Sequence, residues 1–204
     1  MRVLYVTALI IAADQISKIF IKGLDLPMLG IAIQGMQLGQ SIPVLGNFLR
    51  ITFIENPGMA FGIEVGGKFF LTLFSVAASI GILIYLYAVR KESLVFRVSL
   101  AMILGGAVGN LIDRVFYGVL YGDAPLFYGK VVDFIDVDFF TINFMNFHLT
   151  RFWVFNIADA SVTIGVLVML IFHRTIEKEG SKAIDQPQQP LETTPSHTES
   201  TPFV

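Results

Sequence analysis

Four long apolar stretches constrain the fold of this sequence more than any other feature. They run roughly from Val3 to Lys22, Phe69 to Val89, Ser93 to Ile112 and Phe152 to Phe172. A helix needs about 20 mostly apolar residues to cross the hydrocarbon core of a bilayer, and each stretch meets that standard. The composition agrees, because 54% of the 204 residues are hydrophobic and only 15% are charged. We therefore predict a membrane α-helical fold with four transmembrane helices.

The first stretch shares one property with secretory signals, because Arg2 precedes its apolar core. However, Asp14, Lys18 and Lys22 continue the stretch at four-residue steps, as a helix does, and no A-x-A cleavage site closes it. We interpret it as a retained transmembrane helix, with a cleaved signal as the alternative.

Basic residues in the short connections indicate the orientation. Arg90 and Lys91 lie between the second and third stretches, Arg97 lies near the start of the third, and three more basic residues follow the fourth. Because Lys and Arg are enriched in cytoplasmic loops, both chain termini are expected to be cytoplasmic. Residues 1–175 then form one membrane domain with two outer segments, 23–68 and 113–151, and residues 176–204 form a polar tail that is expected to be disordered and cytoplasmic.

The outer segments are too long to be simple turns. Apolar alternation over Phe48–Ile54 and a strand-like run over Val131–Asp138 predict a small extracytoplasmic β-sheet. The aromatic run from Phe139 to Phe155 predicts an interfacial segment on the outer leaflet.

Several kinds of function are disfavoured. A net charge of -2 gives no basic field that would attract nucleic acid. Cysteine is absent, and His148 and His173 are separated by a whole span, so we expect neither a metal centre nor a cofactor. The missing internal repeat weakens the case for a transporter.

Ionisable residues inside membrane spans indicate function by default, because they are costly there. Asp14 and Lys18, four residues apart, form either an intrahelical salt bridge or part of a site. Asn56 stands in a turn rich in Pro and Gly, which is either an ordinary turn or a hold on substrate backbone.

The end of the third stretch carries Asn110, Asp113 and Arg114, which can share one helix face. Asp113 and Arg114 either stop the helix at the interface or face another helix. The nearby glycines favour the second interpretation, since small residues let helices approach closely.

Asp133 and Asp159 are lone carboxylates among apolar neighbours, where the pKa of a carboxyl group rises. Brought together they would share a proton, so that one acts as general base toward water and the other donates to a scissile carbonyl. Asn156 lies three residues before Asp159 and could orient it. Asp159 could alternatively be the N-cap of the last helix. Three further acidic residues are expected to be simply solvated: Asp123, Asp136 and Asp138.

Five motifs occur in order along the chain. They are Asp14-Gln15-Ile16-Ser17-Lys18, Asn56-Pro57-Gly58-Met59-Ala60-Phe61, Gly109-Asn110-Leu111-Ile112-Asp113-Arg114, Val132-Asp133-Phe134 and Phe155-Asn156-Ile157-Ala158-Asp159. Together, over roughly the first 175 residues, they closely resemble the lipoprotein signal peptidase family, also called signal peptidase II.

The resemblance implies a bacterial inner-membrane aspartic endopeptidase that removes the signal peptide from diacylglyceryl-modified prolipoproteins, cleaving before the lipidated cysteine. It places the catalytic pair on Asp133 and Asp159. It also implies contact with membrane lipids, inhibition by cyclic peptide antibiotics such as globomycin, and an active site toward the outer face; we expect a monomer. Residues implied to line or support the substrate site are Asn56, Asn110, Arg114 and Asn156, and residues implied to have structural duties are Asp14, Lys18 and Asp113.

Two segments depart from the family pattern. They are residues 28–40, rich in Gly, Gln and Met, and residues 115–130, which contain three aromatic-glycine pairs. Neither touches the two aspartates. Two rival functions remain: a transporter in which Asp14, Asp133 and Asp159 relay protons or cations, and a noncatalytic assembly factor that docks through its outer segments.

Overall fold

The structure is a computed structural model that describes residues 2–46, 48–58, 67–138, 142–144, 147–149 and 154–172. The predicted tail 176–204 and most of the predicted interfacial segment 139–155 lie outside the described residues. Of that segment, the backbone of two short strands and residues 154–155 are described.

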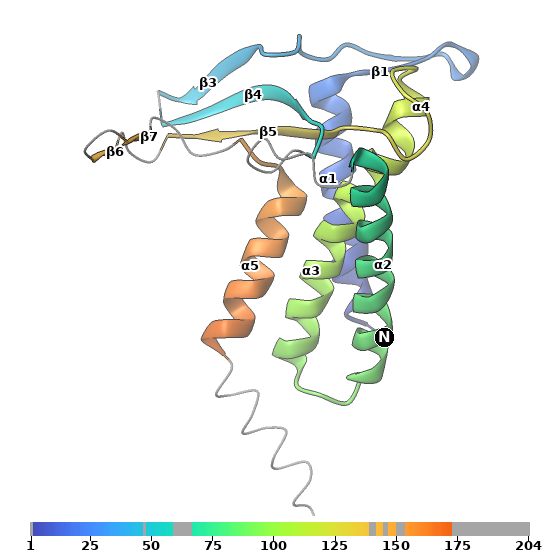
Figure 1. Cartoon of the computed structure of the whole chain (residues 1–204), viewed down its shortest axis with the longest axis vertical. Coiled ribbons are helices and arrows are strands. Elements are labelled where there is room, and N and C mark those ends of the chain that lie inside the picture. The colour runs from blue at the N-terminus through green and yellow to red at the C-terminus, as the bar shows by residue number, and fades with distance from the viewer. Residues whose placement is uncertain are drawn as a thin grey trace, which may run out of the picture.

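Among the residues that the structure describes, three helices are long and apolar enough to cross a membrane. These are α1 (Leu4–Lys22), α2 (Gly67–Ala88) and the helix that begins with α3 (Leu94–Ile112). A fourth apolar helix, α5 (Ile157–Ile171), is shorter, at 15 residues. The four lie side by side, and α3 packs against each of the other three (Figure 1). The predicted membrane-helical fold is confirmed, with α5 as the short member of the bundle.

A small sheet crosses one end of the bundle (Figure 1). Its strands are β3 (Ser41–Leu45), β4 (Leu49–Asn56) and β5 (Val131–Val137), which pair antiparallel in that order. The two strand signals in the sequence fall on β4 and β5, so the predicted sheet is confirmed. The N-terminus and the α2–α3 connection lie at the opposite end of the bundle.

Two short hairpins accompany the sheet. After α1 the chain forms β1 (Leu24–Leu26), the 3-10 turn η1 (Pro27–Leu29) and β2 (Ile31–Ile33). Of these, β2 lies wholly within the segment 28–40 that departs from the family pattern. Beyond β5, a second hairpin pairs β6 (Ile142–Phe144) with β7 (Phe147–Leu149).

Helix packing depends on small residues along α3. A Cβ added to Gly106 would collide with the carbonyl oxygen of Ala158 on α5, so that only glycine allows this approach. Beside it, Ser161 donates to the carbonyl oxygen of Met102 at 3.2 Å and so connects α5 to α3. Thr7 on α1 likewise donates to the carbonyl oxygen of Ala101 at 2.8 Å.

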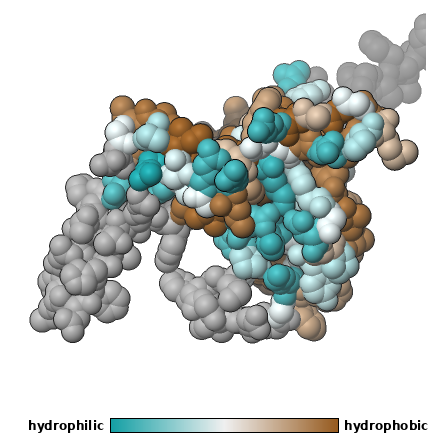
Figure 2. Space-filling view, turned by 90° about the horizontal axis from the view of Figure 1, so that it is seen from above, coloured by the Kyte–Doolittle hydropathy of each residue, from teal (hydrophilic) through white to brown (hydrophobic). Residues whose placement is uncertain are grey.

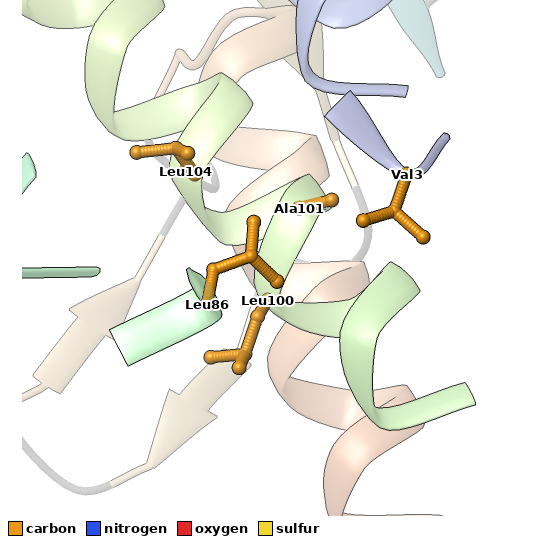
Figure 3. Packing of buried hydrophobic residues seen from close by; sticks show 5 residues of the cluster. All are labelled: Val3, Leu86, Leu100, Ala101 and Leu104. Atoms are coloured by element: carbon orange, nitrogen blue, oxygen red, sulfur yellow. The ribbon is translucent and has the colours of Figure 1, made fainter. Parts of the chain in front are cut away.

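A buried apolar cluster closes the end of the bundle that lies away from the sheet. It joins α1, α2 and α3 through Val3, Leu86, Leu100, Ala101 and Leu104 (Figure 3). By contrast, large apolar side chains on the outward face of α2 remain exposed, which is typical of helices surrounded by lipid. Viewed onto the sheet end, hydrophilic residues gather over the end of the bundle (Figure 2).

The third helix extends further than the sequence predicted. Helical backbone continues from α3 through a π-helical turn, η3 (Asp113–Tyr117), and the short α4 (Gly118–Leu120). The alternative in which Asp113 only stops the helix at the interface is wrong, because its side chain is buried and paired with Lys18 on α1.

A second correction concerns the acidic residues that were expected to be solvated. Asp136 is only 2% exposed, and it accepts a hydrogen bond of 2.7 Å from Thr52 across the β4–β5 ladder. Asp123 does lie toward solvent, where its carboxylate contacts Lys22 at 3.2 Å.

Candidate active site

The two lone aspartates meet where the sheet joins the last helix. Asp133 lies within β5, and Asp159 lies in the first turn of α5. The backbone of Phe155 pairs with that of Ile135, with N···O distances of 2.7 and 3.1 Å. This bridge fixes the start of α5 beside β5, and residues from distant parts of the chain become neighbours.

Asn156 is the N-cap of α5 and connects the two carboxyl groups. Its side-chain oxygen accepts from the backbone N–H of Asp159 at 2.9 Å, and the Asp159 carboxylate accepts from the backbone N–H of Asn156 at 3.3 Å. This is a capping box. The Asn156 side-chain nitrogen lies 2.7 Å from Oδ1 of Asp133. Asp159 is therefore not the N-cap, which the sequence had left as an alternative.

Two further asparagines complete the connection. Asn56, the last residue of β4, donates to Oδ2 of Asp133 at 3.1 Å. Asn110 on α3 donates to Oδ1 of Asp159 at 2.7 Å, and its side-chain oxygen lies 3.0 Å from the Asn156 nitrogen. Asp133, Asp159 and these three asparagines form what we call the carboxylate–amide cluster.

The environment of Asp133 favours its protonated form. Burial and, next, the nearby charge of Asp159 raise the pKa of Asp133 to about 7, although hydrogen bonds from Asn56 and Asn156 and the charge of Lys18 act in the opposite direction. The residue is 3% exposed. A carboxyl group in this state can donate a proton near neutral pH, which is unusual for an aspartate.

Lys18 lies directly behind the cluster. Its ammonium is 2.8 Å from Asp14, 2.8 Å from Asp113 and 2.9 Å from the side-chain oxygen of Asn110, and it is fully buried. The intrahelical pairing of Asp14 and Lys18 is therefore observed. They form an intrahelical salt bridge, and that bridge touches a residue of the carboxylate–amide cluster.

The two acids that flank Lys18 also fix backbone. Asp14 accepts from the N–H of Ala158 in the first turn of α5 at 3.0 Å. Asp113 accepts from the N–H of Val132 in β5 at 3.1 Å. The Lys18 ion pairs thus hold both elements that carry the paired aspartates.

Two residues that contact this group of ion pairs, Gln15 and Tyr117, were not identified from the sequence. Gln15 donates to Oδ1 of Asp113 at 2.9 Å and to the carbonyl oxygen of Gly109 at 3.0 Å. Tyr117 donates to the side-chain oxygen of Gln15 at 3.0 Å. The spacing of Tyr117 four residues after Asp113 placed both on one helix face and could have indicated the tyrosine.

Arg114 lies between the turn after β4 and the paired aspartates. Its guanidinium is close enough to Asp133 and Asp159 to interact with both electrostatically. A Cβ placed on Gly58, which has a φ of +87°, would lie 4.0 Å from its Nη2 and would collide with the side chain of Leu71. The structure therefore gathers every site residue that the sequence singled out into one region.

The described residues include no group of three or more His, Cys, Asp or Glu side chains that could hold a metal ion. The chemistry that this region offers is a protonated carboxyl group beside a second carboxylate, both oriented by amides, at the edge of an apolar bundle. That arrangement can activate a water molecule and protonate a carbonyl oxygen.

Comparisons with known proteins point to one family over most of the chain. A family model described as Signal peptidase (SPase) II matches residues 6–175. The Lipoprotein signal peptidase of Bacillus subtilis is 35% identical over 181 residues, which cover 89% of this chain and 97% of that protein. The one from Porphyromonas gingivalis is 34% identical over 210 residues, covering 87% and 86%.

Solved structures show the same fold. A bacterial membrane enzyme determined by the in meso method at 2.3 Å resolution is 29% identical, with a TM-score of 0.60 over 92% of this chain and 93% of that one. Another, at 1.9 Å resolution, is 31% identical with a TM-score of 0.60 over 83% and 90%. The residues matched by the family model, 6–175, include the whole carboxylate–amide cluster.

Proposed function

The chain belongs to the signal peptidase II family, and from that premise we propose that Asp133 and Asp159 are the catalytic pair with which it works. The family membership makes the chain a bacterial membrane peptidase that removes signal peptides from prolipoproteins, with the aspartic mechanism of its family. The observation that carries the assignment of residues is the carboxylate–amide cluster, in which amide groups connect the two carboxylates.

The two aspartates take different roles. Asp133, with a pKa of about 7, holds the proton and donates it to the carbonyl oxygen of the scissile bond. Asp159 accepts hydrogen bonds at both oxygens, from the Asn110 side chain and the Asn156 backbone. These bonds fix the orientation of the Asp159 carboxyl group, and because Asp133 holds the proton, Asp159 acts as the base that removes a proton from the attacking water.

The substrate is a prolipoprotein whose cysteine carries a diacylglyceryl group, and the bond before that cysteine is cut. The acyl chains enter from the lipid between the helices, because the pair lies where the apolar bundle meets the sheet. Asn56 and Arg114 would contact the peptide backbone, since both border the pair and Arg114 offers a fork of N–H donors.

The pair faces the outer side of the bacterial inner membrane. Arg90 and Lys91 follow α2 at the end of the bundle that lies away from the sheet, and the N-terminus is at that same end. The positive-inside rule then makes this end cytoplasmic and the sheet extracytoplasmic. We further propose that the chain acts as a monomer and that globomycin blocks the site at Asp133 and Asp159.

Cleavage of a lipidated precursor tests the assignment. The purified full chain in detergent is incubated with a diacylglyceryl-modified precursor, and the shift of the product on a gel is followed. Asp133→Asn and Asp159→Asn should each remove turnover while the protein stays folded. Asp25→Asn, an exposed acid on β1, is the matched control and should keep full activity. Retained cleavage by Asp159→Asn would remove the pair from the mechanism.

A further inference from the structure

Glu55 is placed beside the proposed active site without touching it. It precedes Asn56 at the end of β4, where Glu55 pairs with Val132 and Asn56 pairs with Val131 of β5. Successive side chains of a strand point to opposite faces. Asn56 therefore reaches Asp133 diagonally on one face, while Glu55 extends on the other.

Two lysines bind the Glu55 carboxylate, one at each oxygen. Lys22, the last residue of α1, lies 2.5 Å from Oε1, and Lys130, just before β5, lies 2.6 Å from Oε2. The side chains of Glu55 and Lys22 are both 10% exposed. One carboxylate thereby connects the end of α1, the end of β4 and the start of β5.

Other groups around this carboxylate keep the ions in place. Asp123 from the loop after α4 lies 3.2 Å from Lys22, and the Tyr121 ring lies 4.1 Å below the same ammonium. Burial raises the pKa of Glu55, but hydrogen bonds and charge from Lys130 and Lys22 outweigh it and leave that pKa below its usual value. Glu55 is therefore charged at neutral pH.

The ion pairs lie at the end of the β4–β5 ladder that carries Asn56. Beyond Asn56 the chain leaves the sheet at a turn, in which the N–H of Gly58 donates to the Asn56 side-chain oxygen at 2.9 Å. The pairing of Asn56 with Val131 is the last of the register. A diagonal ion pair between Glu55 and Lys130 closes this end on the face opposite the one that carries Asp133.

We propose that Glu55 is a positioning residue, fixed by Lys22 and Lys130, that holds the end of β4 so that Asn56 donates to Asp133. The inference rests on the proposed catalytic role of Asp133. It assigns a purpose to the segment 115–130, since Tyr121, Asp123 and Lys130 belong to it.

The positioning role of Glu55 can be detected in the pH dependence of the reaction rate. The groups that face Asp133 are Asn56 from β4, Asn156 and Asp159 from α5, Lys18 from α1 and Arg114 from η3. The hydrogen bond from Asn56 lowers the pKa of Asp133, so its loss raises that pKa above about 7. Because Asp133 must be protonated to donate, the alkaline limb of the rate profile then moves to higher pH.

The test compares pH profiles of kcat/KM for cleavage of a lipidated precursor by the full chain. Glu55→Ala should shift the alkaline limb upward by about half a unit to one unit. It should lower kcat by about three- to tenfold and leave KM within about twofold, since Asp133 acts on the transition state. Glu55→Gln, which keeps the shape of the side chain and one acceptor, should shift the alkaline limb in the same direction by a smaller amount.

Asp25→Asn removes one negative charge from the same side of the molecule and should leave the limb where it is. A folded Glu55→Ala with an unshifted limb would overturn the inference; if that variant does not fold, an unshifted limb in Glu55→Gln does so. A wild-type chain that fails to cleave would instead defeat the proposed function.

Discussion

Asparagine suits the junction between β5 and α5 because one side chain both accepts and donates. As an N-cap, the Asn156 oxygen accepts from a helix N–H that would otherwise be unpaired. Its nitrogen remains free to donate to Asp133. An aspartate could cap the helix equally well, but it would bring a third negative charge beside the pair and would have nothing to donate. The choice of amide thus allows two carboxylates to lie close together.

A protonated Asp133 has a consequence for stability that can be measured. In the unfolded chain its pKa is near the ordinary 3.8, and in the folded chain it is about 7. Between these values the folded state binds more protons, so the contribution of this group to stability falls as pH rises from about 4 to 7 and is constant above. Asp133→Asn removes that contribution.

Thermal unfolding in detergent at pH 5 and pH 8 should therefore show a larger gain, or a smaller loss, for Asp133→Asn at pH 8 than at pH 5, relative to the wild type. Asp25→Asn serves as the control and should show no difference between the two pH values. An Asp133→Asn effect that is equal at both would mean that Asp133 is ionised throughout this range.

The close contact between α3 and α5 is possible because Gly106 has no side chain. Gly106 faces the Ala158 backbone and the Ser161 hydroxyl so closely that a methyl group has no room. Glycine normally weakens a helix, so its presence here reflects the approach of the neighbouring helix rather than local preference. The same contact places Ala158, and with it the start of α5, next to Asp14.

Gly106→Ala should therefore destabilise the protein by about 1–3 kcal/mol, because the collision is with backbone, which cannot rotate away. Gly81 on α2 provides a matched comparison, since a Cβ there meets nothing within 4 Å. Gly81→Ala should leave the stability unchanged or raise it slightly. Midpoints of unfolding in one detergent would compare the two, and equal midpoints would contradict the packing argument.

The molecule as a whole is joined through one buried cation. Lys18 on α1 contacts acids that in turn hold the first turn of α5 and the strand β5. Removing a buried ion from such a group leaves its partners charged without compensation, which is more costly than the loss of an exposed pair.

Lys18→Met should consequently lower the unfolding free energy by about 3–5 kcal/mol, because Asp14 and Asp113 would remain buried without a cation. Lys91→Met, at the exposed α2–α3 connection, is the control and should have little effect. Adding Asp14→Asn to the Lys18 variant should restore part of the loss. A Lys18→Met protein as stable as wild type would show that the buried acids tolerate isolation.

The hydrophobic pattern of the sequence was enough to predict the helices and the sheet, because a span's length and a strand's alternation are local properties. The candidate catalytic residues could also be predicted from the sequence, because a carboxylate among apolar neighbours, as at Asp133 and Asp159, is unusual. The short length of α5 and the continuation of helical backbone past Ile112 could not be predicted. The first depends on where the chain meets the sheet, and the second depends on which partners bury Asp113.

What the pattern of residues could not decide is which polar groups touch. Asp136 was expected to be solvated, but the β4–β5 pairing places Thr52 diagonally across from it. Nothing in the sequence around Glu55 indicated that Lys22 and Lys130 would meet at its carboxylate. The physical reason is that local preferences act over a few residues, whereas burial and hydrogen bonding join groups about 20 to 140 residues apart in this chain. The chain's own residues fixed its membrane character and its chemistry, and folding settled the geometry in which that chemistry takes place.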